Sequence, residues 1–143
     1  MYRTRKQTKR YNPKQKRQVH LSGQAPCPFC DMNPDQIVRD GKTMRLIKNI
    51  YGYKLWEGMN VNDHLMIVPK RHAEGIAEFN KAEKIEMMDL MAEYEGKGYN
   101  VYARESQNAI KSVPHQHTHL LKTHNKRARF FVFSEKPYFV WKI

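Results

Sequence analysis

The sequence lacks the features of exported and membrane-spanning proteins. It has no apolar run near the length of about 18 residues that a transmembrane helix requires, and no signal-peptide pattern. It contains only two cysteines, and both belong to one Cys-x-x-Cys. Without an export signal, this spacing indicates metal binding or redox chemistry and not a structural disulfide. We therefore expect a soluble, cytoplasmic protein.

Acidic residues are absent from positions 1–20. That segment contains eight basic residues, which are Arg3, Arg5, Lys6, Lys9, Arg10, Lys14, Lys16 and Arg17. The whole chain has a net charge of +12, whereas the residues after position 20, with 18 basic and 14 acidic side chains, contribute only +4. Like charges repel and few apolar groups are available for burial, so residues 1–20 are predicted to form a disordered basic arm. The rest, 21–143, suits a single domain.

The basic arm has two interpretations, which are a nucleic-acid-binding segment and a solvated extension without function. Its cations could follow a phosphate backbone, with Tyr2 and Tyr11 available to stack on bases. RNA or single-stranded DNA is therefore a predicted partner. A solvated extension without function explains the same composition equally well.

Short apolar and aromatic runs predict that strands make up most of the domain. The predicted strands cover 37–38, 44–47, 51–56, 65–68, 99–104, 113–121, 129–133 and 138–141. Turns at Asp40-Gly41 and Lys136-Pro137 separate two of the neighbouring pairs. Strands with one inserted helix predict an α+β fold with an antiparallel sheet.

One long helix is predicted between the fourth and fifth strands. Asn80 is its expected N-cap, and Glu83 is placed to reach back to the cap in a capping box. Gly96 or Gly98 ends the helix. The residues expected to pack in the core, from their helical spacing, are Ile85, Met88, Met91 and Tyr94.

Three histidines, His115, His117 and His119, alternate with other residues and lead into two leucines. In a β-strand, alternate side chains share one face, so the three imidazoles would lie in a row. His115 and His119 would then be about 13 Å apart, at about 3.3 Å per residue. One zinc ion needs its nitrogen ligands within about 2.1 Å and could not collect all three. The row is better suited to lining a groove in which one imidazole acts as nucleophile or base.

Two further segments join this row in a recognisable order. Asn62-Asp63-His64 opens the apolar run Leu65-Met66-Ile67-Val68, which Pro69-Lys70-Arg71-His72 follows; Cys27-Pro28-Phe29-Cys30 lies upstream. From about Cys27 to Leu121, the chain resembles the histidine triad (HIT) family of nucleotide hydrolases and transferases. The resemblance implies a HIT-like antiparallel sheet and hydrolysis or transfer at the α-phosphate of a nucleotide conjugate. The enzymes that the resemblance implies are phosphoramidases and dinucleoside polyphosphate hydrolases.

The resemblance also implies roles for individual residues. His117 is the expected nucleophile, and it would form a covalent nucleotidyl-histidine intermediate. The His115 carbonyl would accept the Nδ1 proton of His117. His119 would contact the phosphate and help to protonate the leaving group, and Ser112 and His64 would bind the phosphates. Family members often form homodimers that extend the sheet, so a homodimer is a further expectation.

Several residues depart from the family pattern. Gln116 and Thr118 are polar, where the family usually has apolar residues between its histidines. Ile110-Lys111 replaces a common Gly-Gln, and Arg104 replaces a common Asn. Lys111 and Arg104 would add positive charge near the phosphates. Trp56 occupies the position of the ribose-contacting acid or amide, and the adjacent Glu57 is the alternative ligand for the ribose.

Zinc is the predicted cofactor, in a structural role. Two cysteines in a knuckle supply two tetrahedral ligands, and two histidines would complete a Cys₂His₂ site. The resemblance to zinc-bearing family members, including hexose-phosphate uridylyltransferases, assigns Cys27, Cys30, His72 and His115 as the ligands. A redox pair resembling a glutaredoxin site and a pair of plain buried thiols are the competing interpretations. His20 and His124 fall outside both histidine patterns and are expected at the surface.

A second function from another class is compatible with the same residues. A zinc-stabilised nucleic-acid-binding module could keep the HIT-like fold without catalysis. Turnover of an adenosine phosphoramidate would discriminate the two functions.

Overall fold

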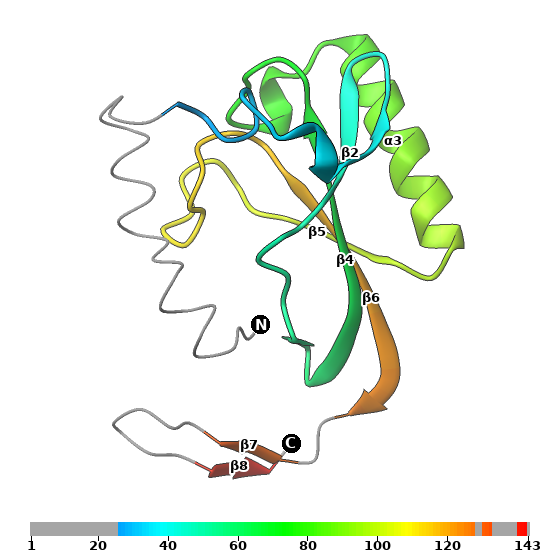
Figure 1. Cartoon of the computed structure of the whole chain (residues 1–143), viewed down its shortest axis with the longest axis vertical. Coiled ribbons are helices and arrows are strands. Elements are labelled where there is room, and N and C mark those ends of the chain that lie inside the picture. Colours follow the sequence, from blue (N-terminus) through cyan, green and yellow to red (C-terminus); the bar gives the residue numbers. More distant parts are fainter. Residues whose placement is uncertain (1–25, 128–129, 133–139, 143) are drawn as a thin grey trace.

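The computed structural model describes residues 26–127, 130–132 and 140–142. Figure 1 shows a twisted sheet with the helix α3 against one of its faces. The helical elements are the 3₁₀ turns η1 (Pro34–Gln36) and η2 (Ile76–Glu78) and the helix α3 (Lys81–Gly96). The strands are β1 (Ile37–Asp40), β2 (Met44–Lys48), β3 (Leu55–Trp56), β4 (Met59–Pro69), β5 (Asn100–Ala103), β6 (Thr118–Arg127), β7 (Phe130–Val132) and β8 (Val140–Lys142). The predicted arm, 1–20, whose last residue is His20, lies outside the described residues.

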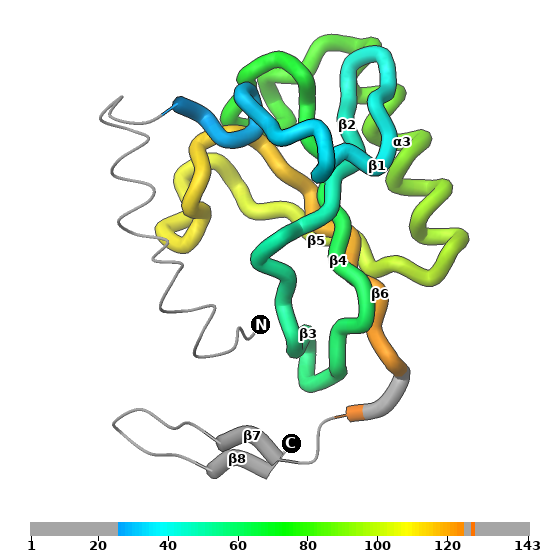
Figure 2. The backbone as a smooth tube through the Cα atoms, viewed as in Figure 1, coloured from blue at the N-terminus to red at the C-terminus, as the bar shows by residue number. Residues whose placement is uncertain are grey.

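Six of the strands form one antiparallel sheet, in the order β1-β2-β4-β6-β5, with β3 paired to β4. The long strands β4 and β6 cross the middle of this sheet side by side, as Figure 2 shows. The predicted α+β fold with an antiparallel sheet is confirmed. β7 and β8 form a separate antiparallel pair, as predicted, although the turn predicted at Lys136-Pro137 lies outside the described residues.

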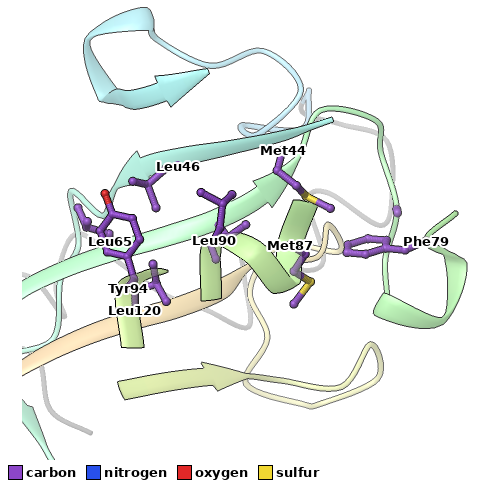
Figure 3. Packing of buried hydrophobic residues seen from close by; sticks show 10 residues of the cluster. Met44, Leu46, Leu65, Phe79, Met87, Leu90, Tyr94 and Leu120 are labelled. Carbon is purple, nitrogen blue, oxygen red and sulfur yellow. The ribbon is translucent and has the colours of Figure 1, made fainter. Parts of the chain in front are cut away.

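The two faces of the sheet have different neighbours. On one face, apolar side chains of β2, β4 and β6 pack against α3 (Figure 3); the residues include Met44, Leu46, Leu65, Ile67, Leu120, Met87, Leu90 and Tyr94. On the other face, Met66 and Val68 of β4 pack with Ile47, Phe29 and Met32. Alternation along β4 and β6 places His64 and His119 on this second face, away from α3.

The helix begins where its capping sequence predicts, but a different face is buried. Asn80 Oδ1 accepts a hydrogen bond from the Glu83 N–H at 2.9 Å, and Glu83 accepts one from the Asn80 N–H at 2.8 Å. The predicted capping box is therefore confirmed. The expected burial of Ile85 and Met88 is wrong, since they are 52% and 61% exposed. Met87, Leu90, Met91 and Tyr94, spaced three and four residues apart, face the sheet instead.

Glu83, which is buried, also forms an ion pair with the half-exposed Arg71, and this pair leads to a first prediction. Its carboxylate accepts hydrogen bonds from Arg71 at 2.9 and 3.1 Å, and these bonds are the main cause of its lowered pKa. Glu83→Gln should lower the free energy of unfolding by about 1–3 kcal/mol, because a charged pair and a cap are weakened together. A lowered pKa stabilises the fold above the ordinary carboxyl pKa of 4.5, so the difference between variant and parent should shrink as the pH falls through and below that value.

Urea denaturation at neutral and acidic pH measures this difference. Glu95→Gln is the matched control, because Glu95 is exposed at the other end of the same helix. An equal loss of stability in both variants, or a Glu83 effect that persists unchanged in acid, would contradict the assignment.

Two predicted strands are shorter than expected. Of 51–56, only Leu55–Trp56 pairs in the sheet, because the chain turns at 50–54 so that the Tyr53 N–H bonds to the side chain of His64. Of 113–121, only the part from Thr118 onward is a strand. Within the described part of the chain, no helix combines the length and the apolar character that a membrane crossing requires.

Candidate functional site

The histidine row does not lie on one strand, contrary to the sequence-based expectation. Thr118 pairs with Ile67 of β4, so continued pairing would bring Gln116 opposite Pro69. Proline has no N–H to donate to a ladder, and the Gln116 N–H bonds instead to the Ala73 carbonyl at 2.6 Å. His115 and His117 therefore lie in a buried loop before β6, and only His119 lies in the strand. The three imidazoles consequently have three different environments.

His117 is positioned by the backbone of His115. Its Nδ1 lies 2.8 Å from the His115 carbonyl oxygen, which can only accept, so Nδ1 carries the proton and Nε2 keeps its lone pair. The ring is 6% exposed, and this burial lowers its pKa to about 4. The backbone hydrogen bond opposes the shift, and the charges of Lys111 and Arg104 add to it. His117 is therefore a neutral imidazole at pH 7.

His119 is paired with His64. The His64 Nε2 lies 2.9 Å from the His119 Nδ1, and the ring centroids of His117 and His119 are 5.1 Å apart. The Tyr53 backbone N–H donates to the His64 Nδ1 at 3.0 Å. Three of the histidines singled out in the sequence thus meet at one place, on the sheet face away from α3.

Arg104 and Tyr53 complete this side of the site. Both terminal nitrogens of Arg104 lie 3.2 Å from the Tyr53 hydroxyl oxygen, and one of them is 3.5 Å from the His119 Nε2. The Arg104 guanidinium also lies over the Tyr102 ring, which stacks on His119 with centroids 5.9 Å apart. Sequence reasoning missed Tyr53, because it precedes β3 in a turn and carries no motif.

A second cluster brings together the four predicted metal ligands. Cys27, Cys30, His72 and His115 have donor atoms within 4.8 Å of one another. The His115 Nδ1 lies 3.3 Å from the Cys27 sulfur and 3.6 Å from the Cys30 sulfur, and the His72 Nδ1 lies 3.4 Å from the Cys30 sulfur. A tetrahedron with zinc–sulfur bonds of about 2.3 Å and zinc–nitrogen bonds of about 2.1 Å has edges of about 3.3–3.8 Å. These side chains can therefore hold a metal ion.

His115 connects the two clusters. Its Nε2–H donates to the Pro69 carbonyl at 3.0 Å, which leaves Nδ1 as the ligand atom directed at the cysteines. Burial lowers the His115 pKa to about 4, so the ring is neutral, as a metal ligand must be. Burial and the neighbouring Cys27 raise the pKa of the Cys30 thiol to about 11, so a metal must displace a proton there.

Phe29, at the tip of the Cys-x-x-Cys knuckle, was also missed in the sequence. Its ring centroid lies 5.5 Å from that of His115 and 5.3 Å from that of His117. The same ring packs against the apolar cluster of Ile47, Met66 and Val68. The knuckle therefore covers the His117 ring as well as supplying metal ligands.

The other residues predicted for the site differ in burial and in location. Ser112 is buried in the loop before His115. Lys111 is 1% exposed, and its ammonium group donates to the Glu74 carbonyl at 2.5 Å and to Gln116 Oε1 at 3.1 Å. Trp56 is half-buried against Tyr53 and Tyr102. Glu57 is exposed and has a positive φ of 48° in the turn between β3 and β4. His124 is exposed on β6, as predicted.

Comparisons with known proteins show what this fold and its histidines are similar to. Residues 60–126 match the family model of the HIT domain, so the predicted resemblance is confirmed for that part of the chain. That range includes His64, His72 and the three histidines of the row, whereas Cys27 and Cys30 precede it.

Solved structures share the fold. A hypothetical histidine triad nucleotide-binding protein from Sulfolobus tokodaii superposes with a TM-score of 0.55 at 18% identity, over 70% of each chain. A HIT family member from Bacillus subtilis gives 0.54 at 20% identity, over 71% of this chain and 76% of that one. A Plasmodium falciparum diadenosine triphosphate hydrolase gives 0.52 at 12% identity, over 68% and 67%. No curated protein gives a significant sequence match.

Proposed function

We propose that the protein hydrolyses or transfers nucleotides at the α-phosphate, with His117 as the nucleophile. The observation that supports this best is the hydrogen bond from His117 Nδ1–H to the His115 carbonyl, which directs the lone pair of a neutral imidazole to Nε2. A neutral imidazole is a competent nucleophile near pH 7. The lowered pKa of His117 keeps it in this form throughout the physiological range.

The reaction proceeds in two displacements. The Nε2 lone pair forms a bond to the α-phosphorus while the bond to the leaving group breaks, and the electron pair departs with the leaving group. The product is a nucleotidyl-imidazole on His117. Water or another acceptor then attacks the phosphorus, and the electron pair of the P–N bond returns to Nε2. The proton of the attacking water goes to solvent.

Cationic and polar groups around His117 are positioned to assist. The His119 ring lies next to that of His117, and His119 in turn contacts His64 and Arg104. Ser112 and Lys111 belong to the loop that carries His117, and the charge of Lys111 acts on it electrostatically. These five residues form the phosphate-binding surroundings in this proposal. Among the solved structures of similar fold, one is a diadenosine triphosphate hydrolase.

Zinc is the proposed metal of the Cys27, Cys30, His72 and His115 cluster. Two thiolates and two imidazoles suit its tetrahedral preference, and four protein ligands leave no open position, so its role is structural. The cluster fixes His115, and the His115 carbonyl in turn orients His117. Hydrolysis itself relies on the histidines of the neighbouring cluster.

Turnover of adenosine phosphoramidate tests the proposal against the non-catalytic alternative. The full-length protein should release AMP and ammonia with steady-state kinetics. Complete absence of turnover on this substrate and on dinucleoside polyphosphates would overturn the proposed function. It would favour the zinc-stabilised nucleic-acid-binding module.

Nucleic-acid binding through residues 1–20 is a separate prediction, which relies on their eight cations and lack of acids. If four to six cations neutralise phosphates, the logarithm of affinity for a single strand should fall with the logarithm of salt with a slope of about −3 to −4. Deletion of 1–20 should remove most of that slope and leave phosphoramidate hydrolysis nearly unchanged. Salt titrations on one labelled oligonucleotide measure both, and an unchanged slope after deletion would contradict the prediction.

Two further expectations, a cytoplasmic location and a homodimer, accompany this proposal. Cell fractionation and light scattering respectively measure them.

A further inference from the structure

The chain leaves the sheet between β2 and β3, in a segment formed by residues 49–54. These residues belong to no strand, and Figure 2 shows the chain bowing away from β4 between the two strands. Tyr53 nevertheless turns inward, with its ring centroid 4.6 Å from that of His64 and 5.4 Å from that of His119. Trp56, just after the segment, stacks on Tyr53 with centroids 6.4 Å apart. The 49–54 segment therefore covers histidines on the sheet face away from α3.

The Tyr53 hydroxyl lies among groups that the proposed function assigns to the phosphate. Both terminal nitrogens of Arg104 lie 3.2 Å from its oxygen, and the His119 Nε2 lies 3.4 Å from it. One Arg104 nitrogen is also 3.5 Å from the same His119 Nε2. A guanidinium and an imidazole thus meet at one oxygen atom, which is an arrangement that suits a phosphate oxygen.

The arrangement in the structure leaves little room for a substrate. His117, His119, Arg104 and Tyr53 are each more than nine-tenths buried. Attack on phosphorus requires the His117 Nε2 and the α-phosphate to be in contact and aligned. A nucleotide cannot contact all of these side chains while they are covered, so part of the chain must move before a substrate binds.

A phosphate is a better partner for Arg104 than the Tyr53 hydroxyl is. The planar guanidinium binds phosphate through two parallel N–H···O bonds. In the structure, both terminal nitrogens of Arg104 instead share a single uncharged oxygen. A phosphate would supply two charged oxygens to the same fork. Exchange of the hydroxyl for a phosphate is therefore favourable at Arg104.

We propose that the Tyr53 hydroxyl occupies the place of a substrate phosphate oxygen and that the 49–54 segment is a lid, which the phosphate displaces. In the closed state, the hydroxyl competes with substrate for Arg104 and His119, so Tyr53 forms an autoinhibitory contact. The ligand rests on the proposed function, whereas the competition is a property of binding and requires no turnover.

Tyr53→Phe tests the competition through the direction of its effect. It keeps the ring and the backbone N–H and removes the hydroxyl, so Arg104 loses this partner in the closed state. The dissociation constant for AMP, measured by calorimetry on the full-length, metal-loaded protein, should fall about tenfold, the effect of about one hydrogen bond. The affinity for adenosine, which has no phosphate, should stay unchanged. An AMP affinity that stays the same or weakens would overturn the inference.

A second substitution locates the effect at Arg104. In an Arg104→Gln background, Tyr53→Phe should change the AMP affinity by no more than about twofold, because the shared guanidinium is gone. Tyr99→Phe is the matched control. It removes a hydroxyl that donates to Asp63, and it should leave the AMP affinity unchanged. An equal effect of Tyr53→Phe with and without Arg104 would contradict the competition.

Trp56 reports on the movement of the lid. The chain has two tryptophans, so Trp141→Phe leaves Trp56 as the only one. Saturating AMP should shift its emission to longer wavelength, because the indole leaves the Tyr53 ring and meets water. An unchanged spectrum at saturation would overturn the lid.

Turnover separates this inference from the proposed function. If the parent hydrolyses adenosine phosphoramidate and Tyr53→Phe binds AMP no more tightly, the inference fails and the proposed function stands. If the parent shows no turnover while Tyr53→Phe binds AMP more tightly, the inference stands and the proposed function fails. If neither protein binds AMP, the inference fails.

Discussion

Replacement of His117 with alanine should reduce nucleotidyl transfer at least about a thousandfold and leave the fold intact. The imidazole of His117 is the proposed nucleophile, and enzymes lose most of their rate without their nucleophile. His119 is not an equivalent replacement, because both of its ring nitrogens have neighbours: Nδ1 lies 2.9 Å from His64 and Nε2 lies 3.4 Å from the Tyr53 hydroxyl oxygen. Initial rates on adenosine phosphoramidate measure the loss.

The variant's metal content and melting temperature report on the fold. Both should stay close to those of the parent, because the His115 ring remains in its cluster. His124→Ala is the control, since His124 is exposed on β6, the strand that follows the His117 loop, and its activity should be normal. Addition of free imidazole to His117→Gly should restore part of the rate. Near-parental activity of His117→Ala would exclude His117 as the nucleophile.

Cys27→Ser should lower both metal content and thermal stability. Four ligands surround the proposed zinc position, and a bound metal stabilises only the folded state. At a free metal concentration about a thousandfold above the dissociation constant, that stabilisation is about 4 kcal/mol. For a domain of this size, a loss of that order lowers the melting temperature by about 10 °C. Elemental analysis and thermal melts of protein purified without chelator measure the two effects.

Chelator provides the matched comparison. It should lower the melting temperature of the parent protein and have little effect on Cys27→Ser. Chelator should also lower the activity of the parent protein, because the Cys-x-x-Cys knuckle carries Phe29, which packs on the His117 ring. A metal-free parent protein, fully folded with a reversible Cys27–Cys30 disulfide, would support the redox interpretation instead.

Local sequence signals predicted the local structure well. The capping box at Asn80 and Glu83 requires only residues three positions apart, and the structure contains it. The buried face of the helix depends on which side meets the sheet, and two sets of residues had suitable spacing. The helical spacing predicts Ile85 and Met88 in the core, whereas Met87 and Leu90 pack against the sheet.

The sequence predicted which histidines belong to the site better than it predicted how they are arranged. Alternation predicted a strand through His115 and His117, but the loss of pairing opposite Pro69 depends on the register between two distant strands. The metal cluster came from a family resemblance, and the structure brings its four residues together. Tyr53 and Phe29 carry no motif, and only the folded arrangement places them beside the histidines.

The central claim is tested most directly by the mass of the protein during turnover. The full-length protein, mixed with excess adenosine phosphoramidate and quenched in mild alkali, should gain the mass of one adenylyl group. Fragmentation should locate the group on His117, and the adduct should be absent from His117→Ala. An active protein that never carries an adduct, or that carries it on another residue, would contradict the account.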